Sequence, residues 1–116
     1  MKITDEVKGN VAVIHLEGKV MGGPDATMFH GKLHEFVNAG KKKVVIDLGG
    51  VEWMSSVGLG MLISALTTLK NNGGELKLAG VTKTIQSLLT ITRLTTIFDT
   101  SDTVDEAIKK FGADLA

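Results

Sequence analysis

Two adjacent serines, Ser55 and Ser56, are the residues of this sequence whose type and position could support chemistry. They follow a short β-branched run and stand where an apolar helical pattern begins, so we expect them at the entrance of a helix. A serine there can act as an N-cap, whose oxygen accepts a hydrogen bond from an unpaired backbone N–H. It can also carry a phosphate, which the helix dipole would stabilise while roughly two negative charges are added to the surface. Spacing alone leaves both roles open, and capping is the more common one.

Two glycines, Gly58 and Gly60, fall in the first turn expected for this helix. Each weakens a helix by about 1 kcal/mol relative to alanine. Such a cost is understandable where another backbone must come close, and equally where the glycines relieve crowding against the sheet. The sequence leaves both explanations open.

Three histidines have weaker support as functional residues. His30 and His34 are four positions apart, which places both rings on one side of a helix, as a metal-binding pair requires. No third ligand is evident, and the pair lies at the edge of the apolar stripe, so we interpret both as amphipathic boundary residues. His15, inside an expected strand, is interpreted as structural.

We expect no enzymatic activity, no metal and no cofactor. Asp47 and Glu52 could form a carboxylate pair for acid–base chemistry, but no nucleophile, metal site or set of oxyanion donors accompanies them. The sequence has no Gly-x-x-x-x-Gly-Lys-Ser/Thr loop for phosphates, and it lacks the third glycine of a dinucleotide fingerprint. Trp53 and Met54 precede the helix, and for both we favour filling of the core over a role as exposed contact anchors.

The elements that must position the serines follow from hydrophobic spacing. The segment 2–7 and an apolar stretch ended by Gly18 are expected to pair as a hairpin through a turn at 8–10. A helix is expected over about 24–39, with proline in its first turn and Gly40 as its stop.

The serines themselves belong to a strand–helix–strand unit. The run 44–48 predicts a central, parallel strand that is buried on both faces. Apolar residues then mark one face of the serine-led helix, which ends before a strand at 75–79. Such crossovers between parallel strands are right-handed almost without exception.

The last third of the chain predicts two short helices and one more strand. Thr82 is expected to cap the third helix, and Ser101 or Asp102 the fourth, with a short strand within 95–99 between them. Together these elements predict an α/β fold, as a single domain over 1–116. Its mixed sheet would have four to five strands and about four helices, packed largely against one side.

Charge and composition narrow the choice of partners. Thirteen Lys and Arg balance thirteen Asp and Glu, so no long-range positive field attracts nucleic acid or anionic lipid, and we expect neither to bind. The basic cluster Lys41, Lys42 and Lys43 is interpreted as a solvated turn. The lack of cysteine and the charged beginning of the chain favour a cytoplasmic protein without membrane insertion.

The order of several short motifs resembles the STAS family of bacterial anti-sigma factor antagonists. A strand reading Val45-Ile-Asp-Leu is followed by Met54-Ser-Ser-Val-Gly-Leu-Gly-Met-Leu, which is similar to the family's signature. Further similar stretches begin at Leu16, Gly74 and Leu88, so the resemblance extends over nearly the whole chain. No single motif is as specific as a nucleotide-binding loop, but their order and spacing together are specific. The resemblance implies a STAS-like fold.

The same resemblance assigns roles to residues around the two serines. Alignment on Gly58-Leu59-Gly60 places the family's phosphoacceptor serine on Ser56. It also implies a partner-binding surface next to this residue. That surface would comprise Met54, Ser55, Val57, Gly58 and Leu59, together with Gly22 and Gly23 from the loop 20–23.

The function implied by the resemblance is partner switching. The unmodified protein would bind an anti-sigma factor that is also a serine kinase with a histidine-kinase-like ATPase fold, and a sigma factor would be set free. Phosphorylation of Ser56 by that kinase would end the complex, and a serine phosphatase would restore the unmodified form.

Three positions depart from the family's pattern. Met21 and Ser55 stand where kinase-regulated members often carry aspartate, and Arg93 replaces a glycine that is common before the next leucine. The missing acids keep a second function open. In it, a stand-alone STAS domain braces the ATPase of a lipid-transport ATP-binding cassette complex, and no serine is phosphorylated.

Overall fold

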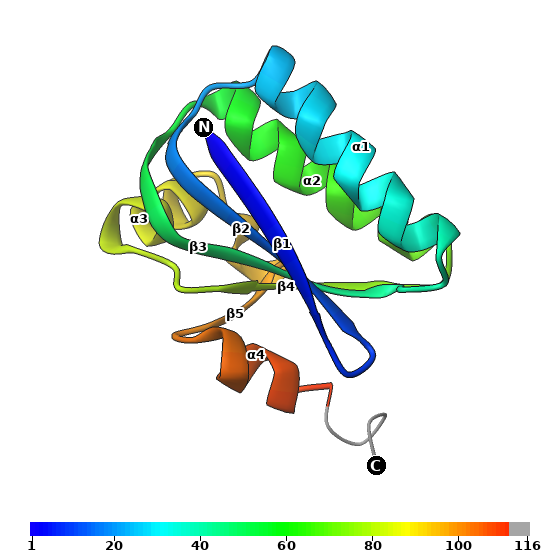
Figure 1. Ribbon diagram of the computed structural model, residues 1–116. Helices are drawn as coiled ribbons and strands as arrows, with labels where there is room; N and C mark the ends of the chain where they lie inside the picture. Colours follow the sequence, from blue (N-terminus) through cyan, green and yellow to red (C-terminus); the bar gives the residue numbers. More distant parts are fainter. Residues whose placement is uncertain (112–116) are drawn as a thin grey trace.

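The computed structural model describes residues 1–111, so the last five positions of the expected 1–116 domain lie outside the described residues. Within the described part, five strands form one mixed sheet in the order β1-β2-β3-β4-β5, and four α-helices pack on it (Figure 1). This confirms the predicted α/β fold. The elements are β1 Lys2–Lys8, β2 Val11–Val20, α1 Pro24–Asn38, β3 Lys43–Met54, α2 Ser56–Asn71, β4 Glu75–Ala79, α3 Lys83–Ile91, the 3₁₀ helix η1 Leu94–Thr96, β5 Asp99–Ser101 and α4 Val104–Lys109.

The opening hairpin and the central strand are as predicted. β1 pairs antiparallel with β2 through the turn that contains Gly9, whose positive φ of 62° suits glycine. β3 lies at the centre of the sheet and is parallel to both β2 and β4. The helix after β3 returns the chain to β4, as the strand–helix–strand pattern requires.

The strands β2 and β3 are longer than predicted. Gly18 does not end β2, and β3 continues beyond the expected 44–48 as far as Met54. The register between β2 and β3 shifts twice, between His15 and Glu17 and between Gly18 and Lys19. At each shift the extra residue lies in β3, as with Glu52, which is passed over between the pairs Gly18–Val51 and Lys19–Trp53. The residues 17–20 of β2 then pair with 50–54 of β3, and we call this two-stranded extension the β2–β3 ribbon.

The glycine pair in β3 explains why this extension is hard to predict. Gly49 and Gly50 are typical of a strand end, but at Gly50 a side chain would place its Cβ 2.7 Å from Cγ of Glu17. The glycine therefore permits close pairing next to the bulge, and it does not break the strand.

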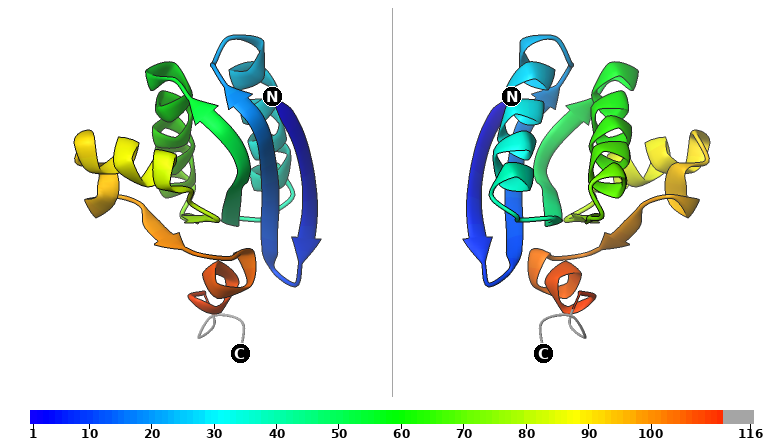
Figure 2. Two further views of the ribbon diagram at one scale, coloured as in Figure 1. Left: turned by 90° about the vertical axis from the view of Figure 1, so that its left-hand side faces the viewer. Right: turned by 90° about the vertical axis from the view of Figure 1, so that its right-hand side faces the viewer.

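The helices divide unequally between the two faces of the sheet, as predicted. α1, α2 and α3 contribute to the larger core, whereas α4 alone packs on the opposite face (Figure 2). The larger core contains fully buried side chains from both layers, such as Phe29 on α1, Leu62 on α2 and Ile46 on β3. The smaller core joins Ala107 of α4 to Val45 of β3.

The last strand and helix differ from prediction in their starting points. The segment expected as a strand at 95–99 begins in η1, and the strand forms at Asp99–Ser101. Asp99 is fixed at the sheet edge because its carboxylate binds Lys77 at 2.8 Å and Lys110 at 2.7 Å. The cap of α4 is Thr103, whose side chain accepts a hydrogen bond from the N–H of Glu106, so the expectation of Ser101 or Asp102 was wrong. The strand extends through Ser101 and displaces the cap toward the C-terminus.

Arg93 is the single non-glycine residue among 1–111 with a positive φ, 61°. The left-handed conformation costs a residue with a Cβ about 1–2 kcal/mol, while glycine adopts it freely. Glycine also loses more chain entropy on folding, by about 0.5–1 kcal/mol. We therefore expect Arg93→Gly to raise the free energy of unfolding by about 0.5–1 kcal/mol in urea denaturation.

The neighbouring Thr92 provides the matched control for this change. Its backbone is in the right-handed region, and its hydroxyl donates a hydrogen bond to the carbonyl of Leu88 at 2.7 Å. Thr92→Gly should therefore lower stability. Unchanged or reduced stability in Arg93→Gly would show that this backbone conformation is not strained.

Candidate functional site

The two predicted serines lie at the far end of the β2–β3 ribbon. Here β2 leads through the loop 20–23 into α1, and β3 leads through Ser55 into α2. The N–H of Ser55 donates to the carbonyl of Val20 at 2.9 Å, which ties the two connections together. Because α1 and α2 lie side by side, their N-terminal ends come out at the same edge of the molecule (Figure 1).

Ser55 is the N-cap of α2. Its side chain accepts a hydrogen bond from the N–H of Gly58 at 3.0 Å, and its backbone is extended, as is usual for a cap. Its hydroxyl also donates to the carbonyl of Met21 at 3.3 Å. The Ser55 hydroxyl thus accepts one hydrogen bond and donates another within the protein.

Ser56 is the first residue of α2 and is exposed. Within residues 1–111, no hydrogen bond engages its hydroxyl, since the capping role belongs to Ser55. The first turn of α2 contains no acidic residue. A negative group at Ser56 would therefore meet the positive end of the helix without a neighbouring carboxylate in that turn.

The loop 20–23 packs directly against the start of α2, as the predicted site requires. Gly22 has a φ of 89°, and a Cβ there would lie 2.4 Å from Cγ1 of Val57. Gly23 has a φ of 64° and precedes α1, and nothing lies within 4 Å of where its Cβ would be. Both the contact with Val57 and the positive φ favour glycine at position 22, whereas at Gly23 the backbone conformation alone does so.

The two glycines of the first turn have different surroundings. At Gly58 a Cβ would lie 2.5 Å from the carbonyl oxygen of Val20 and 3.0 Å from Cγ of Met54. At Gly60 nothing lies within 4 Å, and the residue is exposed. Gly58 therefore relieves internal crowding against β2, whereas the surface beside Gly60 is open to a partner.

Not all residues of the predicted partner-binding surface are accessible. Met54, Gly58, Leu59 and Gly22 are buried. They support the site from beneath and cannot form direct contacts with a docked partner in this conformation. The accessible members of the set are Val57, which is 60% exposed, and Gly23, with Ser55 half-buried.

Sequence reasoning missed two exposed apolar residues at this edge. Met21 is 52% exposed, and its carbonyl is bonded to the Ser55 hydroxyl. Trp53 is 44% exposed, so the interpretation of Trp53 as a core residue was wrong, while Met54 does fill the core. Trp53 pairs with Lys19 in the ribbon, where α4 does not extend to cover the sheet. The sequence indicated only that both residues lie close to a loop, and this position does not tell whether a side chain is buried or exposed.

The carboxylate of Asp47 binds His15 and the backbone of Gly49, and no interaction with Glu52 is seen within residues 1–111. One carboxylate oxygen accepts the N–H of Gly49 at 2.9 Å, and the other lies 2.6 Å from Nδ1 of His15. Nε2 of His15 lies 2.7 Å from a carboxylate oxygen of Glu6. His15 therefore bridges β1, β2 and β3 through its two ring nitrogens, whereas the sequence indicated only a structural role and no partners.

The remaining histidines lie on α1. His30 packs edge-on against Phe29, with ring centroids 5.5 Å apart. Burial, with a smaller contribution from the nearby His34, lowers the pKa of His30. Among residues 1–111, no group of three His, Asp or Glu side chains is arranged to hold a metal ion.

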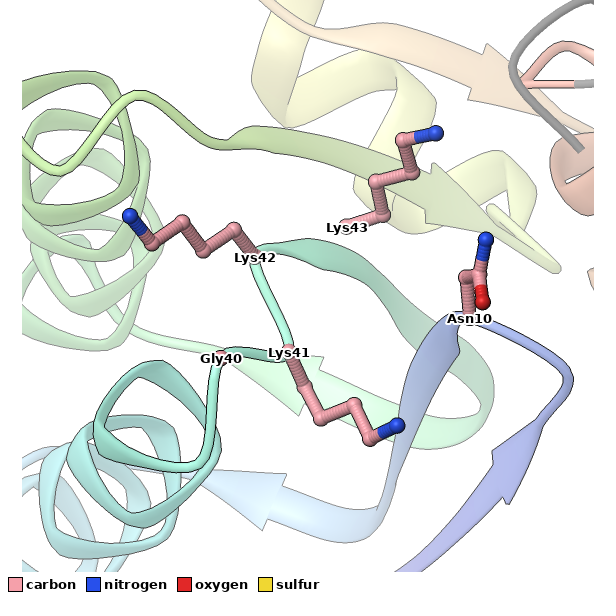
Figure 3. A pocket seen from close by; sticks show the side chains of 5 residues that line it. All are labelled: Asn10, Gly40, Lys41, Lys42 and Lys43. Carbon is pink, nitrogen blue, oxygen red and sulfur yellow. The ribbon is translucent and has the colours of Figure 1, made fainter.

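The lysine cluster lies at the opposite end of the sheet from the serines. Lys41, Lys42 and Lys43 line a shallow hollow of about 200 Å³ with Gly40 and Asn10, where α1 turns into β3 (Figure 3). The side chain of Lys42 points away from Asn10, whereas that of Lys41 extends toward it. The lysines therefore do not converge on one point.

The helices of the described part are too short or too polar to cross a bilayer. This finding concerns residues 1–111, and it includes α2, the helix that begins at Ser56.

Comparison with known proteins gives consistent similarities. The model of the STAS domain matches residues 2–107. A Thermotoga maritima protein named as a candidate anti-sigma factor antagonist is 29% identical over 110 residues, which cover 94% of this chain and 93% of that protein. The crystal structure of a Thermotoga maritima protein with the same description superposes with a TM-score of 0.84, at 24% identity, covering 93% of this chain and 92% of the other. The phosphorylated form of the Bacillus cell fate determinant SpoIIAA gives a TM-score of 0.74 at 19% identity, covering 94% and 98%.

Proposed function

Because the chain belongs to the STAS domain family, we propose that it is an anti-sigma factor antagonist controlled by phosphorylation of Ser56. In the unmodified state it binds an anti-sigma factor that is also a serine kinase of histidine-kinase-like ATPase fold. A sigma factor is then released into the cytoplasm, where this protein acts. The kinase uses its own ATP to phosphorylate Ser56, and a serine phosphatase reverses the modification.

The single observation that carries this proposal is the division of labour between the two serines. Ser55 caps α2 and bonds to the loop 20–23, whereas Ser56 is exposed and its hydroxyl is unengaged. A phosphate on Ser56 could therefore be added without breaking the helix cap. The nearby N–H groups and the helix dipole would stabilise the added charge.

The accessible apolar side chains beside Ser56 support a docking role. Met21 and Val57 are both more than half exposed, and the contact of Gly22 with Val57 holds their segments together. Burial of such side chains in a partner favours association. A phosphate placed beside them would have to be desolvated on docking, which opposes association.

We expect Ser56→Asp to weaken binding to the anti-sigma partner by more than tenfold, and Ser56→Ala to bind constitutively and escape phosphorylation. A loss of roughly 2–3 kcal/mol from desolvation and lost contacts suffices for the first effect, although one carboxylate carries less charge than phosphate. Mass spectrometry after incubation with kinase and ATP locates the phosphate, and binding titrations measure both variants.

Ser55→Ala is the matched control. It should remain a substrate for the kinase, while losing about 0.5–2 kcal/mol of stability with the cap. Phosphate on Ser55 would contradict the assignment. Full partner affinity in Ser56→Asp, with no phosphate on the native protein, would favour the bracing of a lipid-transport ATPase, for which the uncharged Met21 and Ser55 leave room.

A further inference from the structure

His15 lies in a chain of polar side chains that joins three strands on the face covered in part by α4. Its Nδ1 lies 2.6 Å from Asp47 on β3, and its Nε2 lies 2.7 Å from Glu6 on β1. The side chains of His15 and Asp47 are 26% and 25% exposed. In the pairing of the strands, Thr4 of β1 lies opposite His15, and Ala79 of β4 lies opposite Asp47.

The geometry of the bridge favours the doubly protonated ring. An ionised carboxylate can only accept hydrogen bonds, and a neutral imidazole has one donor and one acceptor nitrogen. Both ring nitrogens of His15 face carboxylate oxygens, so both must carry a proton to form two hydrogen bonds. A neutral ring would direct a lone pair at one carboxylate, and that contact would be lost.

The bridge lies where the pairing of β3 with β4 ends and its pairing with β2 continues. Asp47 is the last residue of β3 that pairs with β4, and beyond it β3 pairs only with β2. The register of β2 shifts directly after His15. The β2–β3 ribbon, which carries Ser56 and the loop 20–23 at its far end, therefore begins at this bridge.

We propose that His15 is a proton-operated clamp. When its ring carries both protons, it ties β1, β2 and β3 together at the base of the β2–β3 ribbon, and loss of one proton loosens the ribbon. The clamp is independent of the proposed phosphorylation and of any partner.

Other charges near the bridge do not duplicate its role. Lys8 of β1 approaches Glu6 at 4.0 Å and Asp105 of α4 at 3.6 Å, so it partly balances two of the nearby acids. On the same face, a separate cluster is formed by Lys77 of β4, Asp99 of β5 and Lys110, which directly follows α4. His15 is thus the one group of the bridge whose charge changes near neutral pH.

The balance of interactions favours the charged ring. Partial burial alone would lower the pKa of His15, but the hydrogen bonds to Asp47 and Glu6 and the charges of these carboxylates raise the pKa above its ordinary 6.5. The stability from the clamp is therefore present in full below pH 6.5 and is lost as the pH rises through the raised pKa.

The test uses NMR titration of the histidine rings together with amide exchange of the unmodified chain. His15 should titrate above the ordinary histidine pKa of 6.5 and at higher pH than His30, whose pKa is lowered by burial. Glu6→Gln should lower the proton affinity of His15 by several-fold to about tenfold, since one charged partner is removed. Titration of His15 at or below the ordinary histidine pKa of 6.5 would overturn the proposal.

The second readout is the protection of ribbon amides from exchange, corrected for the intrinsic effect of pH. Protection at residues 51–54 should fall by about three- to tenfold across the titration of His15, while β4 amides change little. In His15→Gln, whose side chain does not titrate, ribbon protection should be independent of pH. A ribbon whose protection does not follow the titration of His15 in the native protein would refute the clamp.

Discussion

Replacing Leu62 with alanine is expected to lower the free energy of unfolding by about 2–5 kcal/mol. Leu62 is fully buried on α2, in the larger core between this helix and the sheet. Removal of its side chain loses apolar burial and leaves a cavity that the packed surroundings fill only in part. Urea denaturation measures the change as a lower midpoint at an unchanged slope.

Ile63→Ala is the matched control for this prediction. Ile63 follows Leu62 on α2 and is also apolar, but it is only partly buried at the margin of the core. Its truncation should therefore cost less than that of Leu62. A loss below about 1 kcal/mol in Leu62→Ala, or equal losses in both variants, would contradict the packing described for α2.

The helices and the central strand could be predicted because each has a repeating apolar pattern and a recognisable end. α1 ends before Gly40 and α3 is capped by Thr82, as expected from residue types that favour these positions. The extension of β3 could not be predicted in the same way. Its glycine pair is typical of a turn, and only the proximity of Glu17 across the ribbon shows why glycine is required there.

The candidate site, too, could be predicted only in part. The order of motifs predicted that the loop 20–23 and the serines lie together, and the bond between Ser55 and Val20 confirms that they do. The sequence could not assign the cap to one serine, because both have the same side chain and differ by one position. Nor could it predict the bridge at His15, since Glu6 and Asp47 are brought to it by strand pairing between distant segments.

The two glycines at the start of α2 should respond to alanine in opposite directions. Gly58→Ala places a Cβ 2.5 Å from the Val20 carbonyl, a backbone atom that can move only if β2 and the loop 20–23 move with it. Overpacking of this kind costs about 1–3 kcal/mol, which outweighs the helix propensity gained with alanine. Gly60→Ala meets no atom within 4 Å and should raise the free energy of unfolding by about 0.5–1 kcal/mol.

Gly58 also links stability to the geometry of the candidate site. The displaced loop carries Met21, whose carbonyl accepts the Ser55 hydroxyl, so Gly58→Ala should shift amide NMR signals at 21–23 and 55–57, while Gly60→Ala leaves those at 21–23 unchanged. Urea denaturation and the NMR comparison can be made without knowledge of the partner. If both variants gained stability, the close approach of α2 to the end of β2 would be refuted. Gly58 would then have to be explained by a requirement outside the fold, since its contact with Val20 is the internal reason for a glycine at this position.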